Sequence, residues 1–105
     1  MRVVQVTWHA LEQFRSRFPQ EAGSSSQMRL LIAKEVDEAL DHNRYSTRQP
    51  KWCREDGARK IGKRNGDERD RSLRFVWTEN HKRVYLVDKA GIETRVVTSI
   101  RPDGR

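Results

Sequence analysis

Helical and strand patterns occupy different parts of this 105-residue chain, and this separation limits the folds open to it. Apolar residues recur at helical spacing within residues 7–18 and again within residues 25–43. Three segments rich in β-branched and aromatic residues follow within residues 73–101, joined by short polar stretches that suit hairpin loops. This order predicts a single α+β domain over residues 1–105. Two N-terminal helices pack on one face of a three- to four-stranded antiparallel sheet that ends in a C-terminal meander.

Both predicted helices have signals for their ends. Thr7 can cap the first helix, and Pro19 disfavours a helical conformation at Phe18. Ser24 and Gln27 fit a capping box at the start of the second helix. The expected buried faces are Trp8, Leu11, Phe14 and Phe18 on the first helix, and Met28, Leu31, Ile32, Val36, Ala39 and Leu40 on the second.

Two further segments have short strand patterns. The segment "RVVQV" (residues 2–6) favours either an edge strand or an extended lead-in to the first helix. Residues 44–72 form a basic loop region with turn signals at Asp56-Gly57 and Asn65-Gly66, and a short strand is expected over residues 58–63. This region is either a solvated loop or an arm that follows a phosphate backbone.

The charge of the chain is strongly positive and unevenly distributed. The net charge is +7 and the isoelectric point is about 10.2. Residues 1–43 contain five Lys or Arg and six Asp or Glu, so the remainder contains seventeen of the 22 basic residues and nine of the 15 acidic ones. A basic surface of this kind attracts a polyanion, and the guanidinium group matches phosphate geometry well. The charge therefore predicts a nucleic-acid partner, the alternative being a solvated basic protein.

Several other classes of protein and site have no support in the sequence. No apolar run approaches the ~20 residues of a membrane span, and the N-terminus lacks the apolar core of a signal peptide. Cys53 is the only cysteine, which fits a cytoplasmic protein without an intrachain disulfide. The three histidines, His9, His42 and His81, are scattered without metal-ligand spacing, and no phosphate-binding glycine loop occurs. We therefore expect no metal and no cofactor.

His9 is the histidine most open to a chemical role. At about 100° per residue, it lies almost opposite the apolar stripe of the first helix, so core packing does not explain it. It also lies in the first helical turn, where the helix dipole favours a neutral imidazole. A neutral imidazole beside arginines suits metal-independent RNA cleavage, in which one group removes the 2′-hydroxyl proton and cations stabilise the oxyanion. The alternative is an exposed residue that hydrogen-bonds water or a neighbour.

The order of motifs along the chain resembles small toxin-like domains of the barnase–EndoU–colicin–RelE ribonuclease superfamily. That resemblance rests on "HALEQFRSRF", "KEVDEAL", "RKIGKR", "LRFVWT", "RVYLV" and "RVVTSI", which follow one another over nearly the whole chain. It implies metal-independent RNA cleavage, often with an antitoxin or immunity protein as partner. Carried over position by position, it makes His9 the acid or base, Arg17 a phosphate contact on the helix, Lys60 a second cation and Thr98 the polar residue of the last strand. Gln13 stands where the family usually has Arg, and it can bond a phosphate or a base edge but cannot neutralise charge.

Further residues are candidates for nucleic-acid contacts. On a regular last strand, Val96, Thr98 and Ile100 share one face, and Ser99 and Arg95 share the other. Thr98 is then either a site residue, as the resemblance implies, or a core threonine, in which case Ser99 and Arg95 form the polar pair. Tyr85 with Arg83 offers a stacking platform for a base, or else Tyr85 belongs to the core. The full set of nucleic-acid candidates is Gln13, Arg59, Lys63, Arg64, Arg74, Arg83, Tyr85, Arg95 and Ser99.

These observations lead to three hypotheses for function. The first is a metal-independent ribonuclease or ribonuclease-like toxin, in which His9, Arg17, Lys60 and Thr98 carry the chemistry. The second is a non-catalytic nucleic-acid-binding protein that uses the same basic surface. The third is a small effector or inhibitor that binds a host or partner protein through the acidic outer face of the second helix or through a sheet edge.

Overall fold

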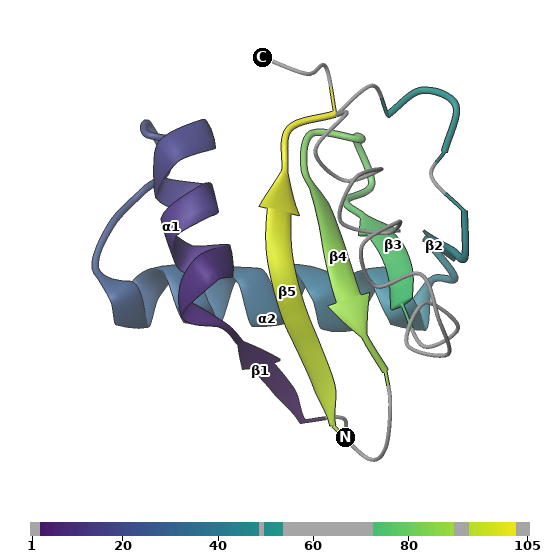
Figure 1. Cartoon of the computed structure of the whole chain (residues 1–105), viewed down its shortest axis with the longest axis horizontal. Coiled ribbons are helices and arrows are strands. Elements are labelled where there is room, and N and C mark those ends of the chain that lie inside the picture. The colour runs from purple at the N-terminus through teal and green to yellow at the C-terminus, as the bar shows by residue number, and fades with distance from the viewer. Residues whose placement is uncertain (1–2, 49, 54–72, 90–92, 103–105) are drawn as a thin grey trace.

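The computed structural model describes residues 3–48, 50–53, 73–89 and 93–102, which form two helices and one five-stranded sheet (Figure 1). The elements in chain order are β1 (Val4–Val6), α1 (Trp8–Arg17), α2 (Ser25–Asp41), β2 (Tyr45–Ser46), β3 (Leu73–Trp77), β4 (Val84–Asp88) and β5 (Thr94–Ile100). The α+β class predicted from the sequence is confirmed. The strand expected at 58–63, and with it Arg59, Lys60, Lys63 and Arg64, lies outside the described residues.

The sheet is mixed, whereas the sequence predicted an antiparallel one of three or four strands. Its strand order is β1-β5-β4-β3-β2. The contacts of β2 with β3, β3 with β4 and β4 with β5 are antiparallel, but β1 pairs with β5 in parallel, with Val4 opposite Thr94 and Val6 opposite Val96. A parallel pair needs a long connection, and here almost the whole chain separates the two strands. Local patterns contain no information about so distant a partner.

The two helices begin where their capping residues predicted. Thr7 Oγ1 accepts a hydrogen bond from the Ala10 amide at 3.1 Å, and it donates one to the Val96 carbonyl at 2.9 Å, which ties the start of α1 to β5. Ser24 and Gln27 form the reciprocal capping box of α2. Trp8 differs from its prediction, since it is 58% exposed and Ala10 takes a buried place on α1 instead.

One core lies between the helices and one face of the sheet. Figure 1 shows α2 running across the back of the sheet, behind β5, β4 and β3, whereas α1 lies beside β5 beyond the end of β1. The prediction of two helices on one face is therefore met in part, because α1 flanks the sheet. The core residues come from α1 and its C-cap (Ala10, Leu11, Phe14, Phe18), from α2 (Met28, Ile32, Val36, Ala39, Leu40) and from the sheet (Val76, Tyr85, Val87, Val96).

The opposite face of the sheet is also apolar. Its buried cluster consists of Cys53, Leu73, Phe75, Val84, Leu86 and Ile100, with Trp52, Trp77 and Val97 packed against it. Strands buried on both faces show a continuous apolar run instead of alternation, as "VYLV" in β4 does. This face is therefore not the open polar surface on which Ser99 and Arg95 were expected to meet.

A β-bulge in the pairing of β4 with β5 changes which residues of β5 share a face. Leu86 pairs with Thr98, but the next residue of β4, Val87, pairs with Val96, so Val97 is the extra residue. Ser99 faces α1, because its hydroxyl donates to the Ala10 carbonyl at 3.0 Å. Thr98 lies opposite Leu86, a member of the second cluster. The regular alternation expected from the sequence is therefore wrong on this strand.

Candidate functional site

A cavity of about 560 Å³ opens where the end of α1, the β3–β4 hairpin and the end of β5 come together. These three parts of the chain lie at the same end of the sheet, at the top of Figure 1. The cavity, called the basic cleft below, is lined by Arg17, Phe18, Pro19, Gln20, Glu21, Trp52, His81, Lys82, Arg101 and Pro102. Among the described residues that line it, three side chains are basic and one is a carboxylate, a balance that favours an anion.

The β3–β4 hairpin holds His81 at the basic cleft in a defined conformation. Thr78 Oγ1 accepts hydrogen bonds from the amides of Lys82 (3.1 Å) and Arg83 (3.2 Å) and donates one to Asn80 Oδ1 (2.9 Å). The His81 amide donates to the Thr78 carbonyl at 2.9 Å. His81 itself has a φ of 57°, a left-handed conformation that few residues other than glycine adopt. The loop between the two strands is thus fixed by its own polar groups.

Three aromatic rings meet beside the basic cleft. The rings of Trp52 and His81 are parallel within 2°, with their centroids 4.0 Å apart. Trp77 stands with its edge to both, at 5.5 Å from Trp52 and 6.5 Å from His81. Both tryptophans pack against the second apolar cluster, which fixes the position of the Trp52 ring. His81, on top of Trp52, is exposed. An exposed aromatic ring on a rigid support is the usual platform for a nucleobase.

Glu21 places one negative charge at the edge of the basic cleft. Its carboxylate forms an ion pair with Lys82, and the Arg83 guanidinium lies 3.7 Å away. The hydrogen bond from Lys82 holds the pKa of Glu21 below its ordinary value. Lys82 is about half exposed, so an anion that enters the cleft can compete with Glu21 for its ammonium group.

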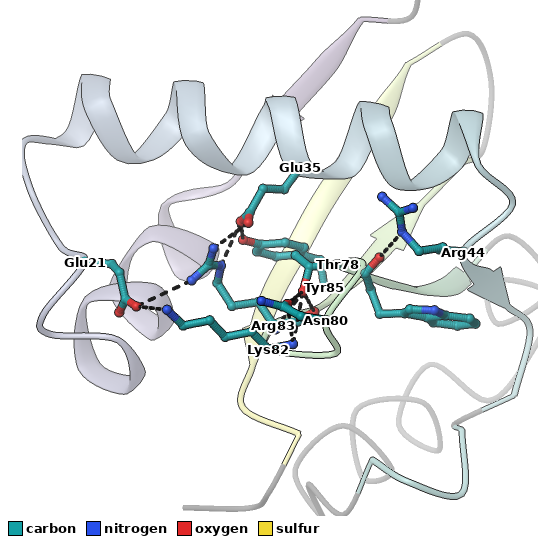
Figure 2. A network of polar contacts seen from close by, with 9 residues as sticks. Glu21, Glu35, Arg44, Thr78, Asn80, Lys82, Arg83 and Tyr85 are labelled. Atoms are coloured by element: carbon teal, nitrogen blue, oxygen red, sulfur yellow. Dashed lines mark hydrogen bonds and ion pairs between the residues drawn. The ribbon is translucent and has the colours of Figure 1, made fainter.

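Arg83 and Tyr85 belong to a buried polar network and not to a nucleic-acid surface (Figure 2). Arg83 donates from Nε and Nη2 to the Glu35 carboxylate at 2.8 and 2.5 Å, and the Tyr85 hydroxyl donates to the same carboxylate at 2.5 Å. The Arg83 guanidinium also lies over the rings of Phe14 and Phe18, at 5.9 and 5.6 Å. Tyr85 is 1% exposed, so no face of its ring is open to a base.

The burial of Tyr85 predicts a loss of stability at alkaline pH. Burial raises the pKa of the Tyr85 phenol well above its ordinary value, and the Glu35 carboxylate adds to this rise. The folded protein therefore keeps the proton where the unfolded chain releases it, so the contribution of Tyr85 is complete below about pH 10 and declines as the pH rises further. We expect the unfolding free energy of Tyr85→Phe, measured with urea, to fall less steeply between about pH 10 and 12 than that of the parent. Tyr45→Phe, at the exposed tyrosine of β2, is the control, and equal slopes in all three proteins would contradict the expectation.

The four residues assigned to catalysis by the resemblance are not all brought together. Arg17 lines the basic cleft, but His9 is exposed at the other end of α1, eight residues earlier and about 12 Å away along the helix axis. Thr98 is 2% exposed and faces the second apolar cluster, on the side of the sheet away from α1. Lys60 lies outside the described residues.

The remaining candidates for nucleic-acid contact are dispersed. Gln13 is half-buried on α1, and Arg95 is exposed on β5. Arg74 is half-buried on β3 and donates from Nη1 to the carbonyl of Leu73 at 2.8 Å. Ser99 is fully buried against α1. None of these four residues lines the basic cleft.

Sequence reasoning missed most of the residues that form the basic cleft. Trp52 lies in the predicted loop region, His81 and Lys82 in a hairpin loop, and Arg101 at the end of the last strand. No motif connects these positions, because the cleft forms only where separate segments converge. The one local signal was the pairing of a histidine with a lysine in a short loop between two strands, which is too common to identify a site.

Comparisons with known protein families, with curated proteins and with solved structures found no match. Within the described residues, no helix is long and apolar enough to cross a membrane. The same residues contain no group of three or more His, Cys, Asp or Glu side chains that could hold a metal ion.

Proposed function

We propose that this chain binds RNA in the basic cleft. The observation that carries the proposal is the convergence of Arg17, Lys82 and Arg101 around a cavity with an exposed aromatic stack at its edge. Cations hold the phosphates of a strand, and an aromatic ring holds a base, so this combination suits a nucleic acid better than a simple anion. The sequence resemblance favours RNA over DNA, and the net charge of +7 favours either polyanion.

The dependence of affinity on salt tests this proposal. Three cations in contact with phosphates release counterions on binding, which gives a slope of about −2 for the logarithm of the association constant against the logarithm of salt concentration. The measurement is fluorescence anisotropy of a labelled RNA at several concentrations of potassium chloride. An association constant that does not change with salt, or the absence of binding at low salt, would show that the basic cleft is no RNA site.

Cleavage of the bound RNA is the second candidate function, and the position of His81 favours it. His81 lines the same cavity as Arg17 and Lys82, so an acid or base and two cations are present together, whereas His9 lies at the far end of α1. RNA cleavage needs a group that moves a proton and cations that stabilise the oxyanion. A protein partner such as an antitoxin or immunity protein stays a prediction of the resemblance.

Cleavage is tested with purified protein and mixed RNA in EDTA, beside the variants His81→Ala and His9→Ala. If the cleft is catalytic, cleavage is lost in His81→Ala and retained in His9→Ala. The reverse result would assign the chemistry to α1. Equal cleavage by all three proteins would mean that neither histidine is catalytic, and no cleavage by the parent would leave RNA binding without cleavage.

A further inference from the structure

The ring of His81 stacks face to face on the ring of Trp52. The two rings are parallel within 2° at 4.0 Å. Trp52 is held from below by the second apolar cluster and from the side by the edge of Trp77. His81 is exposed and lines the basic cleft. Because an aromatic ring has two faces and Trp52 covers one face of His81, the stack can continue on the other.

The hairpin maintains this arrangement at a conformational cost. His81 has a φ of 57°, and left-handed residues other than glycine are uncommon. The loop hydrogen bonds to Thr78 and Asn80 stabilise that conformation. A glycine would adopt the same φ without strain but could not contact Trp52. The residue at this position therefore contributes an aromatic ring, and this exposed residue lines the same cavity as Arg17, Lys82 and Arg101.

We infer that an unpaired nucleobase stacks on His81 and extends the stack from Trp52, so that the basic cleft selects single-stranded segments of RNA. This inference rests on the proposed function, because Arg17, Lys82 and Arg101 hold the phosphates on either side of that base. A base inside a duplex presents its faces to neighbouring bases and cannot reach a side chain in this way. Duplex RNA thus gains only the phosphate contacts.

Three probes separate stacking from phosphate binding. They are a short single-stranded RNA, the same strand annealed to its complement, and an oligomer of equal length whose nucleotides are abasic and which therefore keeps the phosphates alone. The variants are His81→Gly, which removes the ring and suits the backbone, and His81→Phe, which keeps an aromatic face. The matched control is Asn43→Gly, because Asn43 also has a positive φ of 58°, is exposed and does not line the basic cleft.

The expected result is that His81→Gly binds the single strand roughly five- to hundredfold more weakly than the parent protein, the range of one base stacked on an aromatic ring. Its affinity for the abasic oligomer stays unchanged, His81→Phe binds the single strand within a few-fold of the parent, and Asn43→Gly behaves as the parent with all probes. Thermal unfolding confirms that both glycine variants are folded.

Two results with the His81→Gly variant would overturn the inference while leaving the proposed function standing. In one, His81→Gly binds the single strand as tightly as the parent. In the other, its affinity for the abasic oligomer falls by the same factor as its affinity for the single strand, which would mean that His81 contacts phosphates. Equal affinity of the parent for single strand and duplex would also contradict it. If the parent binds none of the three probes, RNA binding in the cleft is itself wrong.

Discussion

The Glu35→Gln variant is expected to lose about 3–5 kcal/mol of unfolding free energy, the usual cost of removing one partner from a buried ion pair. Arg83 is 9% exposed, and its Nε and Nη2 both donate to Glu35. The amide of Gln fills the same space and still accepts from the Tyr85 hydroxyl, but it cannot balance the guanidinium charge. Glu21, at 3.7 Å from Nη1, is too far away to replace the lost hydrogen bonds.

Urea unfolding followed by tryptophan fluorescence measures this loss. Glu38→Gln is the matched control, since Glu38 is exposed on the same helix and its exchange should change the unfolding free energy by less than about 0.5 kcal/mol. The triple variant Glu35→Leu, Arg83→Met, Tyr85→Phe replaces the whole network with apolar groups and should recover most of the loss. If Glu35→Gln is no less stable than Glu38→Gln, the network does not hold α2 to β4.

The double variant Arg17→Gln, Lys82→Gln should bind single-stranded RNA on the order of ten- to a hundredfold more weakly at low salt, since charged hydrogen bonds are among the stronger polar contacts. It removes two of the three cations of the basic cleft. The exchange at Lys82 also removes the nearer of the two cations beside the Glu21 carboxylate and leaves only Arg83, at 3.7 Å, which adds repulsion toward phosphate. The slope of the logarithm of the association constant against the logarithm of salt concentration should become less negative by about 1.4, because each phosphate contact to a single strand accounts for about 0.7.

A control with the same change in net charge distinguishes the cleft from the general charge of the protein. Arg29 and Lys34 are exposed on α2 and do not line the basic cleft. Anisotropy titrations of Arg29→Gln, Lys34→Gln should therefore give an affinity within about threefold of the parent, the effect of screened long-range charge. Equal losses in the two double variants would mean that RNA binds the basic surface without a defined site.

Features of the fold that depend on neighbouring residues could be predicted from the sequence. The caps at Thr7 and Ser24 and the apolar spacing of the helices act within a few residues, and the strands of the meander follow one another along the chain. The parallel pairing of β1 with β5 could not be predicted, because it joins residues about ninety positions apart. Nor could the bulge at Val97, which moves Ser99 to the helix side of the sheet.

The candidate site was predictable to a smaller extent for the same reason. Arg17 was singled out on α1 and does line the basic cleft. Trp52, His81 and Arg101 join it only through tertiary contacts between segments that are distant in the sequence. For Tyr85 the sequence leaves a stacking platform and a core position open, and the structure places it in the core, since β4 is buried on both faces. Glu35 of α2, which is distant in the sequence, compensates the charge of Arg83.

An NMR titration of isotope-labelled protein with a short single-stranded RNA tests directly whether the basic cleft is the binding site. If it is, the indole N–H of Trp52 and the amides of His81 and Lys82 shift with RNA concentration, because they surround the cavity. The amide of His9, at the opposite end of α1, stays unchanged. Shifts that are confined to the first turn of α1, with the Trp52 and His81 signals unmoved, would contradict the assignment of RNA binding to the cleft.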